Sequence, residues 1–255
     1  ESPRVRCALL ECLSQTAHRG HRRAIMAVIA YFKDNHVYVR QAAVVALGEL
    51  AVRGDVEVLE AVMAWLEHAN AEVRFTTIES LKHVADRGDH NAMTLVKKYA
   101  NHHCPEIRFS GIKALSEIGA RGDERALEIA ISRFKDSDSD VRRVSVECIT
   151  DLSECESARV VKALISRLKD KSTSVRLAVV ASLEKIVSKG NKKALDAVMV
   201  HLGNSDAGVR RTALEALGKL ALRGDTHVMS KLIECTRDPD TRVRRTSRDV
   251  ISSLG

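Results

Sequence analysis

The sequence is poor in the residues that build β-sheet proteins. Aromatic residues make up 3% of the 255 positions, and proline occurs three times. This composition disfavours β-sandwiches and barrels, whose strands are enriched in aromatic and β-branched residues. Ala, Leu, Val, Arg, Lys and Glu dominate instead, which is typical of helical proteins. No apolar run approaches about 18 residues, so the sequence predicts no transmembrane helix.

The sequence also lacks the short motifs of common enzyme sites. It contains no glycine-rich dinucleotide loop, Walker loop, GxSxG elbow or kinase motif set. Its six cysteines form no CxxC pair, which favours reduced thiols and an intracellular, reducing compartment. Cys7, Cys12 and Cys148 fall at apolar helical positions, where we expect buried side chains. The cluster His102-His103-Cys104 lacks a fourth ligand and is interpreted as turn residues, so we expect no metal and no cofactor.

A repeat of 34 residues runs through the chain. Two series of landmarks keep this spacing, with Glu156 standing where one glycine of the second series is due. The first series is the dipeptide Val-Arg, once Ile-Arg, at Val5-Arg6, Val39-Arg40, Val73-Arg74, Ile107-Arg108, Val141-Arg142, Val175-Arg176, Val209-Arg210 and Val243-Arg244. The second series is a glycine, at Gly20, Gly54, Gly88, Gly122, Gly190 and Gly224. Two phased series of this length predict a tandem array of one structural unit.

Each unit is predicted to contain two helices. In the segment 209–221 the apolar residues fall on one helical stripe, and an earlier helix is expected over about 55–66 with Val58, Val62 and Leu66 on one side. In Arg53-Gly54-Asp55 the glycine suits a helix end and the aspartate suits the N-cap of the next helix. The sequence therefore predicts an all-α, right-handed α-solenoid of about seven and a half helix pairs.

The predicted units form a single solenoid over residues 1–255. Their boundaries are roughly 1–19 (partial), 20–53, 54–87, 88–121, 122–155, 156–189, 190–223 and 224–255. The first unit has only its second helix, which would leave Leu9, Leu10 and Leu13 uncovered. We therefore expect a fragment of a longer array, or another element that covers this end. Ser247 and Arg248 make the last unit more polar, as a capping repeat requires.

Two segments carry a resemblance to a known family. Residues 34–51 and 204–221 share the Val-Arg dipeptide, an Ala-Leu-Gly tripeptide and a closing Leu-Ala. They resemble HEAT repeats, of the HEAT-like variety found in phycobiliprotein lyases, within the armadillo-like α-solenoids. The resemblance implies the fold over the whole chain, whereas the family's functions include scaffolds, transport factors, lyase subunits and a few enzymes.

The resemblance also brings two specific activities into consideration. A di-iron deoxyhypusine hydroxylase of similar fold uses His-Glu dipeptides as ligands. None of the ten histidines here precedes a Glu, so we do not expect that activity. A tetrapyrrole lyase or chaperone-like subunit stays an alternative that only the resemblance implies.

The outward face of the second helices is the candidate binding surface. Phe75 and Phe109 directly follow the repeated dipeptide in adjacent units, with Val45 and Leu177 flanking them. We predict exposed anchors for a partner protein, the alternative being that a neighbouring side chain covers them. The predicted partner-binding set is Phe75, Phe109, Arg143, Leu177, Arg211 and Arg245.

The arginines of the repeated dipeptide stack as a ladder along the array. The ladder comprises Arg6, Arg40, Arg74, Arg108, Arg142, Arg176, Arg210 and Arg244. One interpretation is an anion-binding surface. The favoured one is structural, with each arginine bonding a loop acid or carbonyl of a neighbouring unit. The loop candidates are Asp34, Asp136, Asp170, Asn204 and Asp238.

The positive charge is concentrated near the C-terminus. Residues 171–255 contain 16 Lys or Arg against 9 Asp or Glu, which accounts for the whole net charge of +7. The predicted basic edge comprises Lys169, Lys171, Lys189, Lys192, Lys193, Arg237 and Arg242.

Two classes of function follow from these surfaces. The first is a non-enzymatic scaffold or structural subunit, binding other proteins of a large complex through the second helices. The alternative is a nucleic-acid- or ribonucleoprotein-associated subunit that uses the basic edge. Arg143, Arg211 and Arg245 each precede an acid by four residues, which weakens the nucleic-acid alternative on the helix face.

Overall fold

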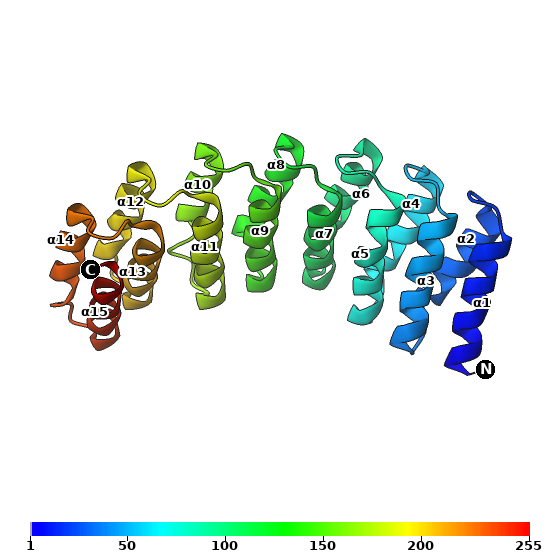
Figure 1. Cartoon of the computed structure of the whole chain (residues 1–255), viewed down its shortest axis with the longest axis horizontal. Coiled ribbons are helices and arrows are strands. Elements are labelled where there is room, and N and C mark those ends of the chain that lie inside the picture. Colours follow the sequence, from blue (N-terminus) through cyan, green and yellow to red (C-terminus); the bar gives the residue numbers. More distant parts are fainter. Residues whose placement is uncertain (1) are drawn as a thin grey trace. The chain divides into compact units, whose positions relative to one another are not determined.

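A computed structural model describes residues 2–255, of which every regular element is a helix (Figure 1). Four of the first helices end in a short 3₁₀ turn, at Ala30–Lys33, Ala64–Glu67, Arg133–Lys135 and Val200–Gly203. The α-helices are α1 (Pro3–Thr16), α2 (Arg22–Ile29), α3 (Val37–Leu50), α4 (Val56–Met63), α5 (Ala71–Val84), α6 (His90–Ala100), α7 (Pro105–Ile118), α8 (Glu124–Ser132), α9 (Ser139–Leu152), α10 (Ala158–Ile165), α11 (Thr173–Ile186), α12 (Lys192–Met199), α13 (Ala207–Leu220), α14 (Thr226–Cys235) and α15 (Thr241–Leu254).

These helices form an α-solenoid, as the repeat predicts. They cluster into two compact bodies, the first up to Ile129 and the second Ala130–Gly255, with the boundary inside α8. Odd-numbered helices are the second helices of the units, and within each body they pack side by side (α1 on α3, α3 on α5, α5 on α7; α9 on α11, α11 on α13, α13 on α15). Even-numbered helices are the first helices and pack against them, as α4 does on α5 and α12 on α13.

The packing faces are those that the helical period predicts. In α13 the five apolar residues of the predicted helical stripe, from Val209 to Leu220, are buried. In the first helix α4 and the 3₁₀ turn that follows it, Val58, Val62 and Leu66 are buried as well. The expected single helix over 55–66 ends earlier, because α4 stops at Met63 and Ala64–Glu67 continue it as a 3₁₀ turn. Such tightening is common in the last turn of a helix, where carbonyls lack partners four residues on.

The turn between units has one conformation throughout the array. Gly54 has a φ of +80°, and the Asp55 side chain accepts hydrogen bonds from the amides of Glu57 and Val58. The Gly54 amide also donates to the carbonyl of Val84, the last residue of α5 in the next unit. The same amide contact recurs at Gly20, Gly88, Gly190 and Gly224.

Glu156 adopts this left-handed conformation without being a glycine, with a φ of 60°. Its amide keeps the contact to the next second helix by donating to Ile186. Its carboxylate accepts hydrogen bonds from the Ser188 amide and the Asn191 side chain, and these bonds hold the Glu156 pKa below its usual value. Both contacts offset the cost of the left-handed backbone, which is about 1 kcal/mol or more for a residue with a Cβ.

The N-terminal helix corrects two expectations. Leu10 is buried, since it lies on the flank that meets α3, whereas Val5 and Leu9 are 47% and 48% exposed. Cys12 is exposed rather than buried, because it lies on the side of α1 that a first helix covers in the other units. Cys148 is buried as expected, and Cys7 is half-buried.

Gly111 lets the second helix α7 come close to the end of the first helix α6. A Cβ at this position would lie 2.7 Å from the Ala100 amide nitrogen and 2.8 Å from the Tyr99 carbonyl carbon of α6. The neighbouring atoms belong to backbone, so they cannot move aside as a flexible side chain would. The equivalent buried positions in other units carry side chains: Ala43, Thr77, Ser145, Val179, Ala213 and Ser247.

We predict that Gly111→Ala lowers the free energy of unfolding by about 1–3 kcal/mol, the usual cost of overpacking. The matched control is Gly203→Ala, because no atom lies within 4 Å of its Cβ and its backbone is compatible with alanine. Urea unfolding followed by circular dichroism measures both. Equal stabilities for the two variants would contradict the close approach of α6 and α7.

Candidate protein interface and arginine ladder

Seven of the eight ladder arginines, from Arg40 to Arg244, bind the loop that precedes their own helix. The Arg142 Nη1 donates to the carbonyl oxygens of Asp136, at 2.8 Å, and Ser137, at 3.1 Å. The same pair of carbonyls, six and five residues upstream, accepts from Nη1 in Arg40, Arg74, Arg108, Arg176, Arg210 and Arg244. The guanidinium therefore holds the loop in a fixed shape against the N-terminal end of the second helix.

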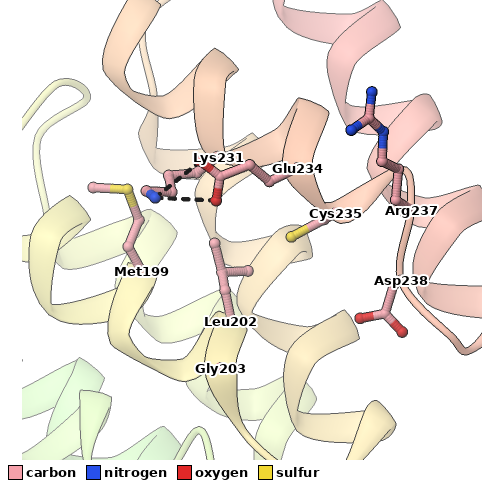
Figure 2. Close-up of a pocket in the computed structure, with 8 residues that line it drawn as sticks. All are labelled: Met199, Leu202, Gly203, Lys231, Glu234, Cys235, Arg237 and Asp238. Atoms are coloured by element: carbon pink, nitrogen blue, oxygen red, sulfur yellow. Dashed lines mark hydrogen bonds and ion pairs between the residues drawn. The ribbon is translucent and has the colours of Figure 1, made fainter.

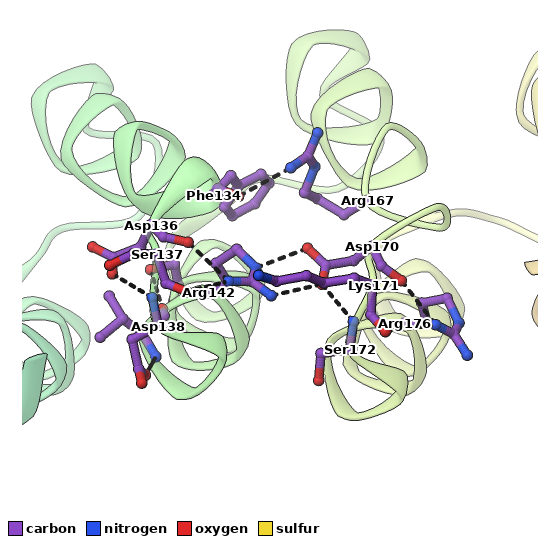
Figure 3. Close-up of polar contacts among 12 residues, drawn as sticks. Phe134, Asp136, Ser137, Asp138, Arg142, Arg167, Asp170, Lys171, Ser172 and Arg176 are labelled. Atoms are coloured by element: carbon purple, nitrogen blue, oxygen red, sulfur yellow. Dashed lines mark hydrogen bonds and ion pairs between the residues drawn. The ribbon is translucent and has the colours of Figure 1, made fainter.

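Three of the arginines also bind the next unit through an aspartate 28 residues on. Arg142 makes a two-pronged ion pair with Asp170, both N–O distances being 2.9 Å (Figure 3). Arg210 pairs with Asp238 in the same way, at 2.7 Å for both bonds, and Arg6 with Asp34 at 2.7 and 3.0 Å. The Arg142 and Asp170 side chains are each 4% exposed, so this pair lies inside the junction.

The ion pairs keep their carboxylates charged. Burial alone would raise the pKa of Asp170, but hydrogen bonds from Arg142 and from the Ser172 amide hold that pKa below its usual value. The hydrogen bond from Arg210 likewise lowers the pKa of Asp238. A carboxylate whose pKa is lowered by folding stabilises the folded state above the unfolded pKa, near 3.9, and loses this effect as the pH falls.

Three units have His or Asn where the others have this aspartate: His68, His102 and Asn204. Each still accepts a hydrogen bond from the amide two residues on, as the aspartates do. The arginines of the preceding units bind elsewhere: Arg40 to Glu72 at 2.8 Å, Arg74 to Ser110 at 3.2 Å and Arg176 to Thr212 at 3.3 Å. His102, expected in an ordinary turn, thus occupies a defined place in the loop hydrogen-bond pattern.

The outward face of the second helices carries a few large apolar side chains. Phe75 on α5 is 48% exposed, Val45 on α3 is 60% exposed, and Leu177 on α11 is 48% exposed. Phe109 on α7 is half-buried, which corrects the expectation of two exposed phenylalanines. Tyr38, which is 69% exposed, was not among the predicted residues. Its position seven residues before Val45 places it on the same side of α3, and this spacing is the signal that identifies it.

The three outward arginines of the second body face acids on their own helices. Arg143 lies 2.7 Å from Glu147, Arg211 lies 3.4 Å from Glu215, and the more exposed Arg245 lies 4.0 Å from Asp249. Such pairs contribute little to stability, but they reduce the positive charge that a phosphate would meet.

The predicted basic edge divides between the two ends of the helix pairs. All seven residues are exposed. Lys169 and Lys171 lie in the loop before α11, and Arg237 and Arg242 lie in the loop and first turn of α15. Lys189, Lys192 and Lys193 lie at the other end, in the turn and first residues of α12. The length of a second helix, about 21 Å for 14 residues, separates these two groups.

The repeat model named HEAT repeats matches residues 1–82, 59–150, 130–198 and 161–252 of the chain. The chain belongs to the HEAT-repeat family. No curated protein matches it.

The solved structures similar to this HEAT-repeat chain include designed and engineered proteins. A designed armadillo repeat protein in complex with the peptide (KR)4 is 14% identical with a TM-score of 0.44, over 91% of this chain and 99% of that one. An engineered protein is 15% identical with a TM-score of 0.43, over 90% and 98% of the two chains. A second designed armadillo repeat protein is 15% identical with a TM-score of 0.41, over 91% and 100%.

One hollow between two units contains a cysteine. A pocket of about 390 Å³ lies between α12 and α14, with Cys235 on its wall and a Lys231–Glu234 ion pair of 3.0 Å (Figure 2). Burial, Asp238 and Glu234 raise the Cys235 pKa, so its thiol stays protonated and weakly nucleophilic. Among residues 2–255, no three His, Cys, Asp or Glu side chains are placed to hold a metal ion. None of the helices in this range is long and apolar enough to cross a membrane.

We expect Asp170→Ala to lower the free energy of unfolding by about 3–5 kcal/mol, because Arg142 would remain as an uncompensated buried charge. Asp249→Ala is the matched control, since its partner Arg245 is 85% exposed, and it should change stability far less. Guanidinium unfolding of both variants provides the comparison. A loss at Asp170 no larger than that at Asp249 would contradict a stabilising role for the buried pair.

Asn204→Asp should raise the free energy of unfolding by about 1 kcal/mol at neutral pH, by giving the buried Arg176 the charged partner that Arg142 and Arg210 have. Because the new carboxylate would be charged in the folded state, the gain should disappear as the pH falls below about 4. Unfolding curves at several pH values measure this. Ser205→Asp, which adds the same charge at an exposed neighbour, should give no gain. A gain that persists in acid would argue against the ion pair.

Proposed function

We propose that this chain is a non-enzymatic protein-interaction scaffold, or a structural subunit of a larger assembly, that binds its partner through the outward faces of the second helices. The observation that carries the proposal is the exposure of Tyr38, Val45 and Phe75 on the neighbouring helices α3 and α5. The fully buried side chains of α3 and α5, such as Leu47 and Leu81, lie on other faces of the same helices.

The chemistry of this surface is that of a binding anchor. Exposed apolar area costs roughly 25 cal/mol per Å² relative to burial, so a partner that covers these side chains gains free energy. Large aromatic side chains dominate the energetics of many interfaces, and the protein has few of them. Leu177 offers a comparable exposed side chain on α11 in the second body.

The polar groups support a scaffold over an enzyme or a nucleic-acid-binding subunit. Buried arginines such as Arg142 and Arg176 are engaged by loop oxygens, so they serve the fold. The outward arginines are matched by acids, and the exposed basic residues are divided between two ends of the helix pairs. Backbone phosphate binding instead relies on several uncompensated cations close together.

Replacing both aromatic anchors (Tyr38→Ser with Phe75→Ser) should abolish partner capture while the melting temperature stays nearly unchanged, because both side chains are exposed. The tagged protein and the double variant are compared by affinity purification from the native source, with quantitative mass spectrometry of the bound proteins. Val200→Ser is the matched control, since Val200 is 76% exposed on a 3₁₀ turn of the second body.

The Val200 variant should retain the partners of the unmodified protein. Retention of the same partners by the double variant would refute the proposed interface on α3 and α5. Recovery of nucleic acid in place of protein, lost at moderate salt, would favour the alternative function.

A further inference from the structure

An apolar groove lies between the first helices α10 and α12, within the second body. Its volume is about 380 Å³, within the range of small ligand sites. Val161 and Ile165 of α10 and Ala194 and Ala197 of α12 supply its apolar lining. Lys162 and Lys193 stand on its two walls, one from each helix.

Small side chains open this groove. Val161 occupies the fifth position after the inter-unit turn residue, and it is half-buried and lines the hollow. Larger residues occupy this position in five other units and are buried there: Ile25, Leu59, Met93, Leu127 and Leu195. Across the groove, Ala194 and Ala197 reach only a short distance from α12. The space is therefore sufficient for one side chain of leucine size contributed from outside.

Lysines outnumber acids around the groove. Lys162 and Lys193 line it, and Lys189 and Lys192 lie just before Lys193 in the chain. All four are exposed, and none has an ion-pair partner among residues 2–255. Two carboxylates lie near these lysines. Glu156 lines the groove and stays negatively charged, because hydrogen bonds from Ser188 and Asn191 lower its pKa. Asp196 lies 3.4 Å from His227 on α14, so four lysines stand against two acids.

We propose that this groove docks an acidic segment of a partner protein, which inserts one aliphatic side chain between α10 and α12 while its carboxylates face the lysines. Charge complementarity selects an acidic occupant, and the apolar floor selects an anchor residue. No aromatic side chain lines the groove to stack a base, which separates this site from a single-stranded nucleic-acid groove. The site lies on the first helices and is independent of the surface on α3 and α5.

The test is fluorescence anisotropy of the full chain with a fluorescein-labelled peptide of Glu and Asp residues around one central Leu. A second peptide with Ser in place of Leu should bind more weakly. Lys162→Glu with Lys193→Glu should reduce affinity for the Leu peptide at least about tenfold. Ala197→Trp, which fills the groove and keeps the lysines, should remove the preference for Leu over Ser.

The matched control is Lys33→Glu with Lys97→Glu, which makes the same charge change at exposed positions of the first body. It should leave affinity within about twofold. Equal effects of the two lysine pairs, equal binding of the Leu and Ser peptides, or no binding at all would overturn the proposal. It would also be overturned if unlabelled polyuridine RNA bound more tightly than the Leu peptide through Lys162 and Lys193.

Discussion

A guanidinium held by two loop carbonyls recurs at the start of the second helices from α3 to α15, and the regularity of the array depends on it. The contact shapes the loop so that its aspartate, where present, faces the arginine of the preceding unit. One residue type thus fixes a turn within a unit and a junction between units. Lysine cannot replace it, because a single ammonium group lacks the five donors and the planar shape that these bonds require.

A second contact secures the opposite end of the same helices. The amide of the left-handed turn residue donates to the last carbonyl of the next second helix, as Gly54 does to Val84. This carbonyl would otherwise lack a partner, as all terminal carbonyls of a helix do. Each junction within a body is therefore joined at both helix ends, which explains how Glu156 can replace glycine without a shift of the repeat.

The sequence predicts the fold well and the surface less well. Residues such as Val209 and Leu217 recur with the repeat, so their burial follows from helical geometry. The exposure of Tyr38 and the partial burial of Phe109 depend on which side chains of neighbouring helices happen to cover them, and a single periodic pattern contains no such information. The burial of Leu10 has a related reason, because the packing of α3 on α1 covers this flank even where no first helix precedes α1 among the described residues.

The substitutions of aspartate at His68 and Asn204 have a mechanical consequence. At these junctions the arginine reaches a partly solvated glutamate or a hydroxyl in place of a buried, two-pronged carboxylate. When a helical array is stretched or bent, strain concentrates where neighbouring layers are least firmly coupled. The α3–α5 and α11–α13 junctions should then separate before the α9–α11 and α13–α15 junctions. The order of charged and neutral residues at this loop position therefore determines which junctions are stiff and which are compliant.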